Sequence, residues 1–251
     1  MKFNLTYGPD IASAPDGFKA TVEAVAAFFE STFTDPVTVN VKVERGLSGG
    51  LLGHSDYALT GPYTFAQITT TLAQETHSGS DVIALAHLPT VDPISGTHAY
   101  YMTSAQAKAL GLQGPSNALD GTVQFANNPP FDYDRSDGIT PGSYDFYGTV
   151  AHELSEVMGR ELNAIGNEVQ TGKPNGYYPF DLFKYSAAGV PTFVGTPRAI
   201  SRRTAASPTW TTSTPIRMTT SAIGLRARAT TLFAPLAMPA SSTQSRRRTS
   251  S

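Results

Sequence analysis

The spacing of apolar residues predicts alternating strands and helices through the first 130 residues. Val37, Val39, Val41 and Val43 alternate with polar residues, as in a half-buried strand. In contrast, residues 16–31 place apolar side chains at helical intervals. By the same patterns we expect strands at 3–7, 37–43, 81–88 and 122–126, helices at 16–31, 64–75 and 104–110, and a Gly-rich connection at 46–53. This order predicts an α+β domain with a mixed, twisted sheet.

A further helix is predicted at about 144–162, with Ser143 as its N-cap. Its apolar residues, Val150, Leu154, Val157 and Met158, fall on one face, and His152, Glu156 and Gly159 fall on the other. The apolar stripe should therefore pack inward, while the polar set faces a cleft.

The polar face of this helix carries a set of residues suited to a metal site. His152 and Glu156 are one helical turn apart, so an imidazole and a carboxylate can share one cation. Glu153 lies beside them, where a base for the attacking water is needed. The zinc-protease pattern H-E-x-x-H has a second His where this chain has Glu156. A surface ion pair between Glu156 and Arg160 is the ordinary alternative.

The run HELSEVMGR at 152–160 resembles the helix of bacterial metalloproteases that carry an H-E-x-x-E-V-M-G-R motif, many of them exported with a PEP-CTERM sorting segment. A second run, YPFDLFKYS at 178–186, is similar to their downstream segment. The wider likeness is to metzincins. It implies a metzincin-like zincin domain over 1–195, zinc (Zn²⁺) as cofactor, a protein or peptide substrate and an extracellular location. It also implies that Tyr185 steadies the oxyanion.

The third metal ligand departs from the metzincin pattern, because the corresponding position is Leu162. Asp181 is the first candidate, since some zinc proteases take a later Asp, and Glu161 and Glu168 come next. His98 or His54 is a further option if folding brings one of them to the metal. A carboxylate-rich site is harder and less selective for zinc, so another divalent cation is an alternative. A catalytically inactive metzincin-like surface or binding domain is the rival interpretation.

A calcium (Ca²⁺) loop is the weaker of two interpretations for residues 132–138. Asp132, Asp134 and Asp137 precede Gly138, but their spacing differs from an EF-hand and the closing Glu is missing. A turn rich in solvated Asp is the favoured interpretation.

Acidic and basic residues are distributed unevenly along the chain. All 20 acidic residues lie at or before Asp181, whereas 182–251 hold 10 basic residues and no acid. Ser, Thr and Arg make up 29 of the residues from 197 to 251. We therefore expect 196–251 to be a disordered tail, with out-of-frame translation as an alternative origin and no role in nucleic-acid binding. The chain lacks Cys, a membrane-spanning apolar run and a recognisable signal peptide, and we expect a monomer.

Overall fold

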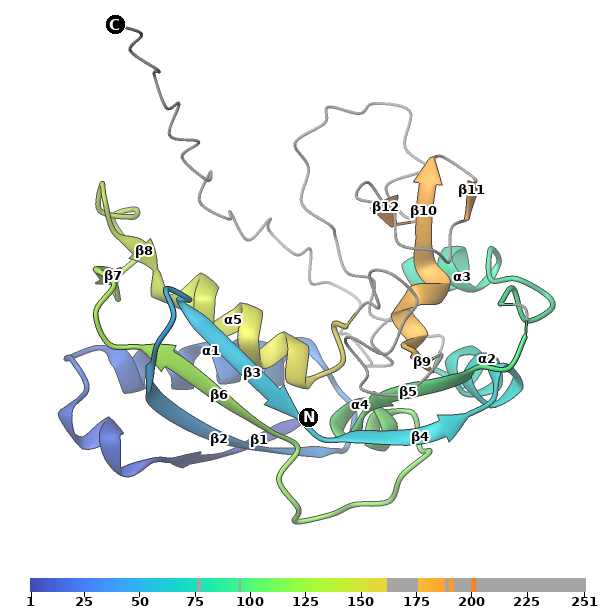
Figure 1. Cartoon of the computed structure of the whole chain (residues 1–251), viewed down its shortest axis with the longest axis horizontal. Helices are drawn as coiled ribbons and strands as arrows, with labels where there is room; N and C mark the ends of the chain where they lie inside the picture. The colour runs from blue at the N-terminus through green and yellow to red at the C-terminus, as the bar shows by residue number, and fades with distance from the viewer. Residues whose placement is uncertain (76–77, 95, 162–175, 188–189, 192–199, 202–251) are drawn as a thin grey trace, which may run out of the picture.

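The computed structural model describes residues 1–75, 78–94, 96–161, 176–187, 190–191 and 200–201, and these form a mixed α+β fold, as expected (Figure 1). The helices are α1 (Phe18–Thr32), α2 (Phe65–Gln74), α3 (Gly79–Leu85), α4 (Ser104–Ala109) and α5 (Phe146–Val157), with 3₁₀ turns η1 (Pro9–Ser13) and η2 (Pro179–Phe183). The strands are β1 (Lys2–Tyr7), β2 (Thr38–Leu47), β3 (Gly53–Tyr57), β4 (Leu59–Tyr63), β5 (Ala99–Thr103), β6 (Gly121–Ala126), β7 (Phe131–Asp132), β8 (Tyr144–Asp145), β9 (Gly176–Tyr177), β10 (Lys184–Ala187), β11 (Val190–Pro191) and β12 (Ile200–Ser201).

The main sheet has four strands in the order β1-β2-β6-β3. β1, β2 and β6 run parallel, and β3 pairs antiparallel with β6 at the edge. The alternating valines of β2 are fully enclosed, with Val39 paired to Phe3 and Val43 to Val123. The predicted strands at 3–7, 37–43 and 122–126 are thus confirmed.

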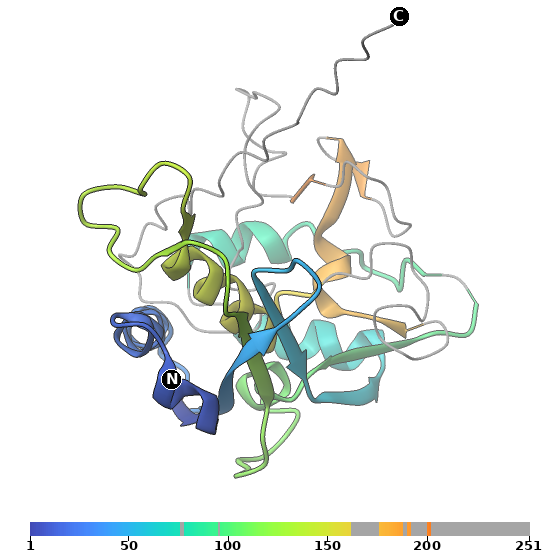
Figure 2. The ribbon, with the colours of Figure 1, turned by 60° about the vertical axis from the view of Figure 1, so that its left-hand side comes forward.

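Two helices, α1 and α5, pack against each other and against this sheet (Figures 1 and 2). Aromatic rings join the layers. The ring of Phe146, at the start of α5, lies 4.8 Å from Phe18 of α1 and 5.1 Å from Phe125 of β6, centroid to centroid. Because all three side chains are buried, they fix the N-terminal end of α5 over the sheet.

A smaller sheet, β4-β5-β9, lies beside the main one, and α2 and α4 pack against it (Figure 1). The predicted helices at 16–31, 64–75 and 104–110 are confirmed as α1, α2 and α4. The strand predicted at 81–88 is wrong, because this segment contains most of α3. A capping box favours the helix over a strand here. The Ser78 hydroxyl accepts a hydrogen bond from the Asp81 backbone, and the Asp81 carboxylate accepts one from the Ser78 backbone.

None of the helices within the described residues is both long and apolar enough to span a membrane, as predicted. Only Ile200 and Ser201 of the predicted tail, 196–251, belong to the described part of the chain, where they pair with β10 as β12.

Candidate metal centre on helix α5

The apolar stripe of helix α5 packs inward, as predicted, whereas His152 and Glu156 on the other face are only partly exposed and Gly159 is buried. Val150, Leu154 and Val157 are fully buried, and Met158 is nearly so. The helix ends at Val157, earlier than the predicted 162, and Gly159 follows its C-cap with a φ of 107°, in the left-handed region that glycine favours. A Cβ there would lie 2.7 Å from Cδ of Gln106, so close packing also requires glycine.

The predicted start of this helix is wrong by a few residues. Asp145, not Ser143, occupies the N-cap, and its side chain makes no capping hydrogen bond. The reason is strand pairing: Tyr144 and Asp145 form β8 against Phe131 and Asp132, so the chain stays extended until Phe146.

His152 and Glu156 come together on the partly buried polar face of α5, next to the edge strand β3. Nε2 of His152 lies 2.8 Å from Oε1 of Glu156. The other carboxylate oxygen, Oε2, accepts a hydrogen bond of 2.6 Å from the Ser55 hydroxyl of β3. Burial alone would raise the pKa of Glu156, but the hydrogen bonds from His152 and Ser55 and the charge of Arg160 hold it below its ordinary value.

Arg160, just beyond the end of α5, contacts the same cluster. Its guanidinium donates to Oε1 of Glu156 at 3.1 Å, to the backbone oxygen of His152 at 3.1 Å and to the Ser155 hydroxyl at 2.8 Å. The surface ion pair that was the ordinary alternative for Glu156 is therefore present, and it coexists with the His152 contact.

Glu153 lies beneath the pair and is buried against the edge strand. A Cβ on Gly53 would lie 2.6 Å from its Oε1 and 2.8 Å from its Cγ, so the missing side chain of Gly53 makes room for this carboxyl group. Burial, followed by the nearby charge of Glu156, raises the pKa of Glu153 to about 8. Sequence spacing placed Glu153 next to His152, but the contact with β3 is tertiary.

Asp181, the first candidate for a third ligand, makes other contacts. Its Oδ1 lies 2.8 Å from Nζ of Lys184, and its Oδ2 accepts a hydrogen bond from the Tyr178 backbone. The side chain is fully buried at η2. Asp181 therefore caps the turn η2 and pairs with Lys184. The contacts that the structure describes for Asp181 include none with His152 or Glu156.

Glu161 lies closer to the cluster. It is buried, it shares a hydrogen bond with Tyr57, and burial followed by the charge of Glu156 raises its pKa to about 8. Glu168 falls outside the described residues, and so does the side chain of Tyr185, whose backbone pairs in β10. Within the described part of the chain, no group of three or more His, Asp or Glu side chains is arranged to hold a metal.

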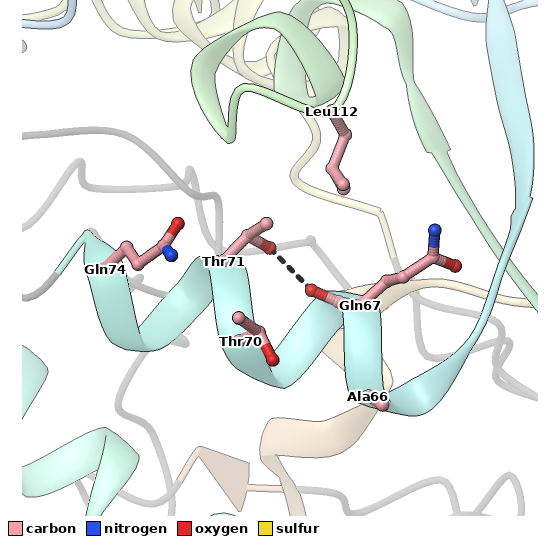
Figure 3. A pocket seen from close by; sticks show the side chains of 6 residues that line it. All are labelled: Ala66, Gln67, Thr70, Thr71, Gln74 and Leu112. Atoms are coloured by element: carbon pink, nitrogen blue, oxygen red, sulfur yellow. Dashed lines mark hydrogen bonds between the residues drawn. The ribbon is translucent and has the colours of Figure 1, made fainter.

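The other predicted ligands, His98 and His54, and the possible calcium loop at 132–138 make local contacts away from the α5 cluster. His98 Nε2 lies 2.8 Å from Asp92 Oδ2, and His54 Nε2 lies 3.4 Å from Asp56 Oδ1. In the Asp-rich loop, carboxylates of Asp132 and Asp134 accept backbone hydrogen bonds within the loop itself, the pattern of a turn. A hollow along α2 is lined by Thr, Gln, Ala and Leu side chains and contains no titratable group (Figure 3).

Sequence reasoning missed Ser55, which is buried in β3 and reaches Glu156 across 101 positions. No local signal marks it, since His54, Ser55 and Asp56 form a polar run with no apolar alternation. It also missed Tyr57, whose hydroxyl lies 3.2 Å from that of Tyr178.

Two side chains of the α5 cluster, the His152 imidazole and the Glu156 carboxylate, are of the kinds that bind divalent cations. An imidazole nitrogen and a carboxylate oxygen converge from one helical face, and a hydroxyl holds the far oxygen of that carboxylate. Imidazole and carboxylate are donor types that zinc accepts, but within the described residues His152 and Glu156 contact each other directly and no third donor joins them. Comparison of the chain with protein-family models, with curated proteins and with solved structures found no match.

Proposed function

We propose that this chain is a metal-dependent peptidase with zinc as the first candidate metal. The observation that carries the proposal is the convergence of His152 Nε2 and Glu156 Oε1 at 2.8 Å on the partly buried polar face of a helix whose opposite face is anchored in the core. Glu153 stands next to them with its side chain packed against Gly53 of the edge strand. The metzincin-like fold belongs to the same proposal and is supported by the mixed sheet and by the position of α5.

Each residue of the α5 cluster has its own role in the proposed hydrolysis. His152 and Glu156 would hold the cation, which supplies Lewis-acid chemistry when bound. Glu153, once ionised, would accept a proton from the attacking water and return it to the leaving amine, so hydrolysis would rise as the pH passes through about 8, the raised pKa of this carboxyl group. Tyr185 remains the predicted oxyanion donor, and Asp181, Glu161 and Glu168 remain the candidates for the third ligand, with the contacts of Asp181 favouring the other two.

The edge strand supports a peptide as the substrate. β3 is the last strand of the main sheet, and within the described residues only β6 pairs with it. An extended peptide can add to such an edge through backbone hydrogen bonds. A peptide bound there would lie along the strand that contacts both Glu153 and Glu156.

Zinc binding to the full chain tests the proposal. We expect the purified protein to bind zinc, measured by elemental analysis and by competition with a chelating dye. His152→Ala and Glu156→Ala should lose this zinc, because each removes one ligand. His87→Ala is the matched control, since His87 contacts the Ile83 carbonyl of α3, and it should bind zinc like the wild type.

Absence of zinc and of any other divalent cation from the wild-type protein would overturn the peptidase proposal. It would favour the rival, an inactive binding domain of the same fold. One observation supports that rival: three protein groups, from His152, Arg160 and Ser55, already satisfy the Glu156 carboxylate. In that case the cluster stabilises the end of α5 and binds no cation.

Gly53→Ala should impair catalysis with little effect on folding. The new methyl group would meet three atoms of the Glu153 side chain at 2.6–2.9 Å, so this carboxyl group must move. Displacing a catalytic group by about 1 Å can lower the rate about 100-fold. Hydrolysis of labelled casein and thermal unfolding measure the two effects. Gly114→Ala, where a Cβ meets no heavy atom within 4 Å, should change neither.

A further inference from the structure

We infer that Glu153 and Glu161 select basic side chains of an extended peptide that pairs with the edge strand β3. The inference concerns binding and requires no metal on α5, so it goes beyond the peptidase proposal. A peptide held in this way would occupy Glu153, the proposed base. It would therefore be a ligand that competes with any substrate at the same edge.

Three glutamates lie in a row against one face of β3, the face that packs on α5 (Figure 1). Side chains alternate between the two faces of a strand, so every second residue of β3 points at this row. From the start of the strand to its end, the contacts are Gly53 with Glu153, Ser55 with Glu156 and Tyr57 with Glu161. A strand added beside β3 would place its own alternate side chains over the same row.

The backbone of β3 directs hydrogen-bonding groups away from the sheet. Its antiparallel pairing with β6 is framed by two bonds, from Ala126 N to the Leu52 oxygen and from Ala58 N to the Asp120 oxygen. In such a ladder, alternate residues point both backbone groups at the partner strand, and the residues between them point both groups outward. The three residues that face the glutamates are the ones in between. Their N–H and C=O groups therefore face the open edge, where no further strand of the described chain pairs with them.

Glu153 and Glu161 form no ion pair within the described part of the chain. Glu156, which lies between them in the row, is paired with Arg160 at 3.1 Å. The other two glutamates are buried, with 6 % and 8 % of their surface exposed. A buried carboxylate without a counter-charge is costly, and an opposite charge close to it favours its ionised form. An ammonium or guanidinium group of a bound peptide would supply that charge.

The spacing of these two carboxyl groups determines which peptides fit. They lie beside Gly53 and Tyr57, four residues apart, which is about 13 Å in a strand. Two basic residues four positions apart in an extended peptide share one face and match this separation. With a spacing of three, the second basic side chain would lie on the opposite face. The site should therefore distinguish the two spacings.

Peptide binding to the full chain in the presence of a metal chelator tests the inference. The probes are two fluorescent Thr-rich peptides of identical composition, with two Lys residues either four or three positions apart. The first should bind about 10- to 100-fold more tightly, the effect of one additional hydrogen bond between charged groups. Methylating the backbone nitrogens of one alternate set of its residues should prevent binding, whereas methylating the other set should be tolerated.

Variants of the protein show whether the glutamates cause this selectivity. Glu153→Gln and Glu161→Gln should each weaken binding of the first peptide about tenfold or more. Asp56→Asn is the matched control and should bind like the wild type. Asp56 is an acidic residue of the same strand, but it lies on the opposite face with 82 % of its side chain exposed.

Equal binding of the two spacings would overturn the inference, and so would equal binding of a peptide in which norleucine replaces both Lys residues. Failure of the wild-type protein to bind the first peptide would also overturn it. None of these results bears on the zinc test, because the chelator removes any metal. Circular dichroism checks the fold of each variant, and the comparison of peptides on the wild-type protein decides the matter if a variant does not fold.

Discussion

Glu153→Gln should abolish most peptide hydrolysis and leave the protein folded with its metal bound. General acid–base groups contribute about 100- to 10,000-fold to catalytic rates, and glutamine cannot accept the proton that Glu153 is proposed to take from water. The substitution keeps the shape of a side chain that is buried against Gly53. Metal should remain because His152 and Glu156 are unchanged. Hydrolysis of labelled casein, elemental analysis for zinc and circular dichroism measure the three properties.

Glu23→Gln is the matched control for this change. Glu23 is an exposed residue of α1 that pairs with Lys19, and its loss removes one carboxylate from the surface. This variant should retain full activity. If Glu153→Gln were equally active, Glu153 would not be the base. If it instead lost zinc, Glu153 would belong to the ligand set, and the division of roles on α5 would be wrong.

Asp120→Ala should destabilise the fold by about 3–5 kcal/mol, because it leaves a buried lysine without its counter-charge. Asp120 lies just before β6, and its Oδ2 is 2.6 Å from Nζ of Lys108 in α4, with both side chains 3 % exposed. Oδ2 also accepts a hydrogen bond from the Asn40 backbone in β2, and Oδ1 accepts one from the Ser104 hydroxyl. One carboxylate thus joins two strands of the main sheet to a helix.

Thermal and denaturant unfolding measure this effect. At about 2–4 °C per kcal/mol for a protein of this size, the midpoint should fall by roughly 6–20 °C. Lys108→Met should cost less, because Asp120 keeps its donors from Asn40 and Ser104. Glu23→Ala breaks an exposed pair, 59 % and 55 % accessible, and should cost no more than about 1 kcal/mol. Similar losses for Asp120→Ala and Glu23→Ala would show that the buried pair does not hold the sheet to α4.

The misassigned helix α3 shows where sequence patterns are ambiguous. Its apolar run reads equally as a short buried strand, because periodicity does not separate the two over so few residues. The structure leaves Val82 and Ile83 about half exposed and buries Ala84, which the strand interpretation did not anticipate. The capping box of Ser78 and Asp81 was the local signal that distinguishes them.

The sequence by itself determined the elements whose information is local. Alternation predicted β2, and helical spacing predicted α1 and the two faces of α5, including the approach of His152 to Glu156, because side chains one turn apart are neighbours on any helix. Tertiary structure alone decided the surroundings of those residues. The space that Gly53 gives to Glu153, the Ser55 hydrogen bond to Glu156 and the pairing of Asp181 with Lys184 depend on how strands and turns pack. The first two join residues about 100 positions apart, and such contacts arise from burial of a shared core, which no local pattern encodes.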